Sequence, residues 1–312
     1  MSRNYGIGSR DMAVAGRMIV ERKFHGGIQS RHDIAQRWEY FCKWVEKRGV
    51  RKMENLSYEL VIQYGQQLQL EVDAGIRKTS SAPKNYVSAI NTVMRLATNA
   101  AWKPVKPGND CGIQPRVYIS TESKAMSEAR HAIAKMQVDE RIACLLDLQR
   151  AFGLRFKESC LLNPAKALSQ AYKQGNITLT DGAKGGKQRS VPCRPGTIAV
   201  LEMAVSIRNG RSMVPKGMTY VEFQRVCYEQ ANLAGISFHS ERHYYAQERY
   251  KEITNAPSPI EAGWSRKTRI LDLASYLNIS EEDAKNLDQQ ARLQISTELG
   301  HNRVGITNVY IG

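Results

Sequence analysis

Apolar residues recur at the three- and four-residue spacing of an α-helix from about residue 30 to residue 100, and this periodicity constrains the fold more than any other feature. Ser30 and Asp33 are plausible N-terminal caps for a helix that Gly49 would end, and later helices follow Ser57 and Ser81. The three apolar faces are Ile34, Trp38, Phe41 and Val45, then Val61, Tyr64, Leu68 and Val72, then Val87, Ile90, Met94 and Ala97. The pattern predicts a small helical bundle.

A Pro- and Gly-bearing stretch from Lys103 to Pro115 follows the bundle and has the composition of a loop. A length of 312 residues suits about two domains. We therefore place the domain boundary near residue 117, with an N-terminal helical domain at 1–117 and a second domain at 118–312. Residues 1–26 are basic and poorly patterned, and we expect an arm or a short helix there.

The second domain reads as mostly helical with one pair of strands. Residues 177–180 (Ile-Thr-Leu-Thr) are β-prone, and Gln188–Cys193 reads as the return strand. Asp181-Gly182 and Gly185-Gly186 between them supply turn chemistry. The predicted fold class is mainly α with a small β-sheet.

The chain carries 45 Lys and Arg residues against 30 Asp and Glu residues, a net charge of +15. Such an excess favours a polyanionic partner, because each phosphate that a cation neutralises releases condensed counterions. Residues 1–117 hold 19 basic and 10 acidic residues, whereas 118–312 hold 26 and 20. The bundle is therefore the more positive part, either as an ordinary solvated surface or as a clamp on DNA.

Several classes of protein are disfavoured. No apolar run approaches the ~18 residues of a membrane span. The first ten residues are polar and unlike a signal peptide. The six cysteines are widely spaced without a C-x-x-C pair, which indicates reduced thiols and no disulfide or zinc framework. We expect a cytoplasmic protein without a membrane partner.

Four short features carry chemistry only when they are taken together. Each feature alone is compatible with an ordinary surface role. Within the third feature, His239 and Arg242 stand at i and i+3 and therefore share a helix face. The features are Gly153-Leu154-Arg155 with Glu158, then Lys184 beside Gly185 and Gly186, then His239 with Arg242, and finally Leu299-Gly300-His301 with Tyr310 nine residues after the histidine.

In order and spacing, these features resemble the tyrosine recombinase (phage integrase) family. That family has an Arg in a G-L-R-x-x-E turn, a Lys in a hairpin of the form G-K-G-x-K-x-R-x-V-P, then H-x-x-R, L-G-H and a Tyr nine residues after that His. The motifs cover 118–312, and residues 28–100 match by helical pattern only. The resemblance implies an N-terminal helical core-binding (SAM-like) domain, a catalytic domain and a C-shaped clamp on DNA.

The resemblance also implies a mechanism. Tyr310 would attack a DNA phosphate to form a 3′-phosphotyrosyl bond, and Lys184 would protonate the leaving 5′ oxygen. The charge that builds on the phosphate oxygens would be stabilised by Arg155, Arg242 and His301.

Further residues take supporting roles in this reading. His239 would accept or orient the tyrosine proton, and Glu158 would orient its neighbours without acting as a catalyst. Lys187 and Arg189 are predicted to contact backbone phosphates. No metal or other cofactor is implied, since cationic side chains supply the electrostatic stabilisation.

One departure from the family pattern is the 62-residue gap from His239 to His301, roughly 35 residues more than the family usually has. The excess falls at about 251–288, with helix-like segments at Leu271–Leu277 and from Ser280. A helix-turn-helix reader is conceivable there, but the second helix begins with three acidic residues that would repel phosphates. We prefer an accessory or protein-contact insertion.

The preferred reading is a site-specific recombinase for integration or excision of a mobile element or phage. It would act on double-stranded DNA as a homotetramer on two sites, with accessory DNA-bending or host recombination proteins, at the bacterial nucleoid. Three alternatives stay open: Xer-like chromosome dimer resolution, nicking and closing like that of a type IB topoisomerase, and a catalytically silent DNA-binding regulator.

Overall fold

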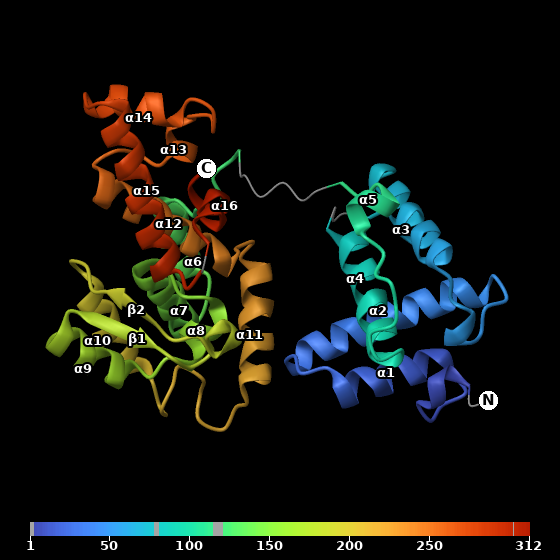
Figure 1. Cartoon of the computed structure of the whole chain (residues 1–312). Helices are drawn as coiled ribbons and strands as arrows, with labels where there is room; N and C mark the ends of the chain where they lie inside the picture. The colour runs from blue at the N-terminus through green and yellow to red at the C-terminus, as the bar shows by residue number, and fades with distance from the viewer. Residues whose placement is uncertain (1–2, 78–80, 115–120, 302) are drawn as a thin grey trace. The chain divides into compact units, whose positions relative to one another are not determined.

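The computed structural model describes residues 3–77, 81–114, 121–301 and 303–312. The chain divides into two compact units, Met1–Val117 and Tyr118–Gly312 (Figure 1). The described part contains no helix that is long and apolar enough to cross a membrane.

The first unit is a helical bundle in which α1, α2 and α4 pack on one another and α3 packs on α4. Its elements are η1 (Asn4–Gly6), α1 (Met12–Lys23), α2 (Ile28–Glu46), η2 (Met53–Asn55), α3 (Tyr58–Asp73), α4 (Ala82–Ala97) and α5 (Pro107–Cys111). The predicted bundle is confirmed, and α1 occupies the segment for which an arm or a short helix was expected.

The centre of this bundle is the indole of Trp38, which is fully buried and donates to the Met12 carbonyl at 3.0 Å. Gly16 on α1 permits this contact, because a Cβ there would lie 1.9 Å from the indole nitrogen. Every residue of the three predicted apolar faces except Val72 belongs to the buried core of this unit.

The caps of these helices agree only in part with the sequence. Ser57 caps α3 by accepting from the Leu60 N–H at 3.2 Å, as its position suggested. The cap predicted for α2 is wrong, since α2 begins at Ile28 after Gly27 and has no side-chain cap. Ile28 is 84% exposed, so the first turn lies outside the apolar face that marked the helix.

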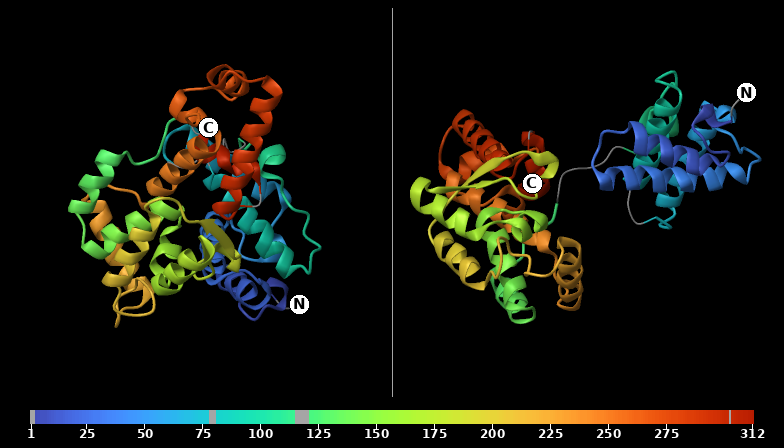
Figure 2. Two further views of the ribbon diagram at one scale, coloured as in Figure 1. Left: turned by 90° about the vertical axis from the view of Figure 1, so that its left-hand side faces the viewer. Right: turned by 90° about the horizontal axis from the view of Figure 1, so that it is seen from below.

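The second unit surrounds α7, which packs against α6, α8, α10 and α12, while α15 packs along α12. Figure 2 shows the two strands beside α9 and α10 at one edge of this unit. The elements are α6 (Glu128–Met136), α7 (Glu140–Phe152), α8 (Phe156–Leu161), α9 (Pro164–Gln174), β1 (Asn176–Leu179), η3 (Lys184–Gly186), β2 (Arg189–Pro192), α10 (Thr197–Ile207), α11 (Tyr220–Leu233), α12 (Phe238–Thr254), α13 (Pro259–Ala262), α14 (Arg269–Leu277), α15 (Glu281–Glu298), η4 (Val304–Thr307) and α16 (Asn308–Ile311).

The strands form the antiparallel hairpin that the sequence predicted, with Ile177 opposite Val191 and Leu179 opposite Arg189. Side chains alternate between faces along a strand. Ile177, Leu179 and Val191 therefore point into the core, and Arg189 shares their buried face. The mainly α fold with one small sheet is confirmed.

Candidate active site

The turn between α7 and α8 begins the site, and it depends on glycine. Gly153 adopts a left-handed conformation with φ +59° and ends α7. A Cβ at this position would lie 2.6 Å from the ring of Tyr245 and 2.9 Å from Leu299. Because the chain turns at Gly153, helix α8 begins soon after α7 ends, and Arg155 is its N-cap.

Arg155 is held from two sides and still reaches solvent. Its Nη1 donates to Glu158 at 2.7 Å, and its Nη2 donates to the Leu299 carbonyl at 3.1 Å. Among the described residues no acceptor contacts its Nε, and the side chain is 22% exposed. The guanidinium therefore keeps donors for an incoming anion.

Glu158 is a fully buried carboxylate that accepts four hydrogen bonds, one of them the bond from Arg155 Nη1 described above. Arg189 binds both of its oxygens, at 2.5 and 2.6 Å, and the backbone N–H of Arg155 donates at 2.6 Å. Burial opposes ionisation, but the Arg189 hydrogen bonds and charge outweigh it and lower the Glu158 pKa to about 2. The expected orienting role fits this position.

Arg189 does not occupy the position expected for a phosphate contact. Its side chain is 6% exposed, and its Nε donates to the Glu298 carbonyl at 2.8 Å while both Nη atoms bind Glu158. A guanidinium turned inward in this way cannot contact a DNA backbone at the surface, so this prediction is wrong. Lys187 is exposed in the hairpin, whereas the side chain of Lys184 lies outside the described part of the structure.

Arg242 projects from α12 into the centre of the site and is fully buried. It donates to the Gly153 carbonyl and, through Nη2, to the Leu299 carbonyl at 2.5 Å. Burial lowers the pKa of its guanidinium to about 10, so the group stays charged at neutral pH. The same Leu299 carbonyl thus orients both Arg155 and Arg242.

Tyr310 brings its hydroxyl to this cluster from α16. The hydroxyl oxygen lies 3.3 Å from Nε of Arg242, which donates to it, and 3.5 Å from Nε2 of His301. His301 Nε2 lies 3.1 Å from Nη2 of Arg242. Arg242 thus donates to the oxygen that a tyrosine nucleophile would use for attack.

Two histidines of α12 lie against the ring of Tyr310. The ring centroids of His239 and His243 lie 5.8 and 4.7 Å from that of Tyr310. His239 reaches solvent, yet neighbouring atoms desolvate its ring and Arg242 and Arg155 add positive charge, which lowers its pKa to about 4. His239 is therefore neutral at pH 7 and able to accept a proton.

The structure thus gathers five of the six residues predicted to be catalytic, and the sixth has no described side chain. Sequence reasoning missed the Leu299 carbonyl and the contact of His243 with Tyr310. It also missed Glu298, which accepts from the Tyr245 hydroxyl at 2.7 Å and from Arg249 at 2.8 Å. The spacing of His243 from His239 is the one sequence signal that could have indicated that His243 lies near the site.

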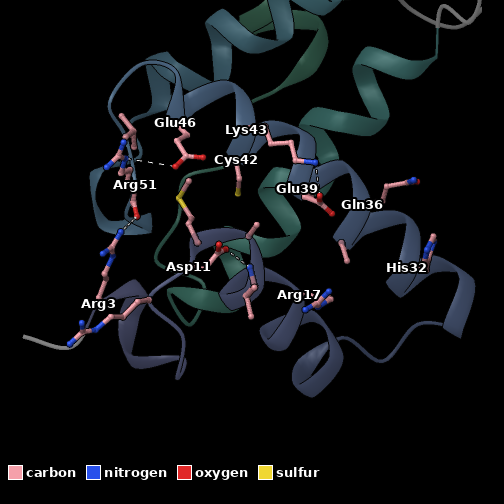
Figure 3. A pocket seen from close by; sticks show the side chains of 16 residues that line it. Arg3, Asp11, Arg17, His32, Gln36, Glu39, Cys42, Lys43, Glu46 and Arg51 are labelled. Carbon is pink, nitrogen blue, oxygen red and sulfur yellow. Dashed lines mark hydrogen bonds and ion pairs between the residues drawn. The ribbon is translucent and has the colours of Figure 1, made fainter.

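A second basic surface lies in the N-terminal unit, where a groove of about 550 Å³ runs between α1 and α2 (Figure 3). Its three acidic residues are engaged: Glu39 pairs with Lys43 at 2.7 Å, Glu46 lies 3.8 Å from Arg51, and Asp11 caps α1. Arg10 and Arg17 are exposed and form no ion pair with any described residue. Positive charge in the groove is therefore available to an external anion.

Comparisons with known proteins agree with this geometry. The family model described as "Integrase" matches residues 112–248, which include Arg155, Lys184, His239 and Arg242. His301 and Tyr310 lie beyond the matched segment. A comparison with curated proteins gave no match.

Solved structures resemble the chain over nearly its whole length. A lambda integrase dimer bound to a COC′ core site has a TM-score of 0.56 at 12% identity and covers 93% of this chain and 91% of its own. XerH recombinase in a post-cleavage complex with a palindromic difH substrate gives 0.55 at 14%, covering 96% and 81%. Tn1549 transposon integrase in complex with circular intermediate DNA gives 0.53 at 11%, covering 97% and 96%.

The matched segment and the fold place the chain with DNA strand-exchange enzymes of the integrase and recombinase kind. Residues 112–248 match the integrase family, and beyond this segment the likeness to tyrosine recombinases is one of fold.

Proposed function

We propose that this protein is a site-specific recombinase that cleaves double-stranded DNA with Tyr310 and rejoins it. The observation that carries the proposal is the position of the Tyr310 hydroxyl, 3.3 Å from Arg242 Nε and 3.5 Å from His301 Nε2. A purely structural tyrosine has no need of a fully buried arginine at its oxygen.

In the proposed reaction the Tyr310 oxygen attacks phosphorus and the bond from phosphorus to the 5′ oxygen breaks. Neutral His239 accepts the tyrosine proton, and Lys184 supplies a proton to the leaving 5′ oxygen. Arg155, Arg242 and His301 donate to the non-bridging oxygens, where negative charge builds up. The phosphotyrosyl ester keeps the energy of the phosphodiester bond, so the reverse attack by a 5′ hydroxyl rejoins the strand without ATP.

Several observations support DNA as the partner. The net charge of +15 is highest per residue in the N-terminal unit, and Arg10 and Arg17 line a groove there. The similar structures hold DNA, and lambda integrase has been crystallised as a tetramer bound to a Holliday junction. We propose a homotetramer on two DNA sites and, by the same likeness, integration or excision of a mobile element.

Covalent trapping tests the proposal. Wild-type protein and Tyr310→Phe are incubated with DNA from the ends of the element, nicked beside the presumed cleavage point, and run on a denaturing gel with EDTA and without ATP. We expect a slow-migrating adduct with the wild type only. No adduct while DNA binding persists would favour the silent regulator. Plasmid relaxation without synapsis would favour nicking and closing of the topoisomerase kind.

A further inference from the structure

The segment between α12 and α15 folds as a small layer with its own core. Ala256, Leu273, Ala274 and Ala284 form a buried cluster separate from the main core of the unit, and Trp264, Ile270 and Leu277 pack against it. The segment contains α13 and α14, and α14 packs along the first part of α15. It is therefore an ordered part of the second unit and not a loose loop.

This layer touches the helix that carries the nucleophile. Helix α13 packs on α16 (Figure 1). The approach is close, because a Cβ at Gly312 would lie 3.0 Å from the backbone nitrogen of Ile260. Ile311, next to Tyr310, is fully buried. The C-terminal end of α16 thus lies between the insertion and the active site.

A chain of polar contacts makes a second connection. Asn308, the first residue of α16, accepts from Nη1 of Arg292 at 2.7 Å. Nε of Arg292 donates to both oxygens of Asp288, at 2.9 and 2.8 Å. Asp288 in turn lies 3.5 Å from Nε of Arg269 on α14 and accepts from the Tyr250 hydroxyl at 2.8 Å.

These contacts are restrictive because they are buried. Asp288 and Arg292 are each 3% exposed, and a buried charge that loses its partner is strongly unfavourable. The carboxylate fixes the Arg292 guanidinium, so its Nη1 points in one direction. Asn308 occupies that direction, and Tyr310 follows one half-turn later.

We propose that the insertion and α15 together form an intramolecular brace for α16, in which Arg292 of α15 is a positioning residue that holds Tyr310 in the active site of its own chain. The inference rests on the proposed use of Tyr310 as the nucleophile. Weakening the brace lowers the fraction of time that the hydroxyl spends beside Arg242, and it leaves the phosphate-binding arginines in place.

The test uses Asn308→Ala, which removes the acceptor and keeps the Asp288–Arg292 pair, and Asn308→Asp, which keeps an oxygen acceptor for Arg292. Ser275→Ala, at an exposed position of α14, is the matched control. Single-turnover cleavage of nicked DNA, DNA affinity and hydrogen exchange of residues 304–312 are measured on the full chain.

We expect Asn308→Ala to cleave about 10- to 100-fold more slowly, as small misplacements of reacting groups do, with unchanged DNA affinity. Its amides at 304–312 should exchange faster while those of α7 keep their protection. Asn308→Asp and Ser275→Ala should behave as the wild type. Wild-type cleavage and unchanged exchange in Asn308→Ala would overturn the brace. Exchange is read without DNA, so it tests the brace even if no variant forms an adduct.

A mixing experiment tests use within one chain. Tyr310→Phe keeps the arginines and Arg242→Gln keeps the tyrosine. We expect their mixture to form no adduct, because α16 stays in its own site. An adduct in the mixture would show that the tyrosine is exchanged between chains and would overturn the inference.

Discussion

Replacing Glu158 with Gln should destabilise the second unit strongly and in a pH-dependent manner. Gln keeps the size of the side chain and can still accept at the N-terminus of α8, so the change isolates the negative charge. Lowering the Glu158 pKa from 4.5 to about 2 corresponds to about 3 kcal/mol of unfolding free energy. Leaving Arg189 buried without a counter-charge puts the total at about 3–5 kcal/mol at pH 7.

The pH dependence follows from the direction of that change. The folded-state pKa lies below the unfolded one, so the contribution of Glu158 is complete above pH 4.5 and is lost as the pH falls towards 2. The difference between wild type and Glu158→Gln should therefore shrink as the pH is lowered through this range. Other carboxylates titrate in both proteins and cancel in the difference.

Urea unfolding at constant ionic strength measures this difference, with the exchange of α7 amides identifying the transition of the second unit. Glu229→Gln is the control, since Glu229 is exposed and lies 3.8 Å from Arg225. Such surface pairs contribute about 0.5 kcal/mol or less. A Glu158→Gln difference below about 1 kcal/mol at pH 7, or one that is equal at pH 7 and pH 3.5, would refute the argument.

Three further predictions concern single residues. Gly153→Ala should lower the unfolding free energy by about 2 kcal/mol or more, through its φ of +59° and the clash with Tyr245; an unchanged urea midpoint would contradict this. The ring nitrogens of His131 lie 2.9 Å from Asp147 on α7 and 2.8 Å from Glu241 on α12. Burial opposes the charged form of His131, but the hydrogen bonds to these carboxylates outweigh it and raise the His131 pKa. Its contribution is complete below the unfolded pKa of about 6.5 and is lost as the pH rises through the folded value, so His131→Gln should flatten the fall in stability above pH 6.5. In an NMR titration of the DNA-free protein His239 should titrate near pH 4, and a value near 6.5 would show that its ring is not desolvated.

The sequence predicted those elements whose signals are local. Ser57, which caps α3, and Pro83, in the first turn of α4, mark helix starts through chemistry within one turn. The hairpin was found because Asp181-Gly182 and Gly185-Gly186 separate two β-prone segments. The start of α2 was missed because Ile28 contributes nothing to the apolar face and Gly27 offers no side-chain cap.

Arg189 was misplaced although its local pattern contained the answer. It stands two residues before Val191 on one strand, so both side chains point to the same face, and that face is buried. The neighbouring Lys184 and Lys187 suggested a basic surface instead. Only the three-dimensional structure shows Glu158 as the partner that makes burial of this arginine possible.

The shared acceptor of the two arginines could not have been derived from sequence, since it is a backbone carbonyl. Leu299 stands 144 positions from Arg155 and 57 from Arg242, and any residue type supplies the same oxygen. Its position is set by the end of α15, where the Leu299 N–H donates to the Ile295 carbonyl. The same helix carries Arg292, which holds Asn308, and begins beside α14. One helix therefore fixes both the carbonyl that orients the arginines and the contact that orients the tyrosine, so the relative position of arginines and tyrosine depends on the rigidity of α15.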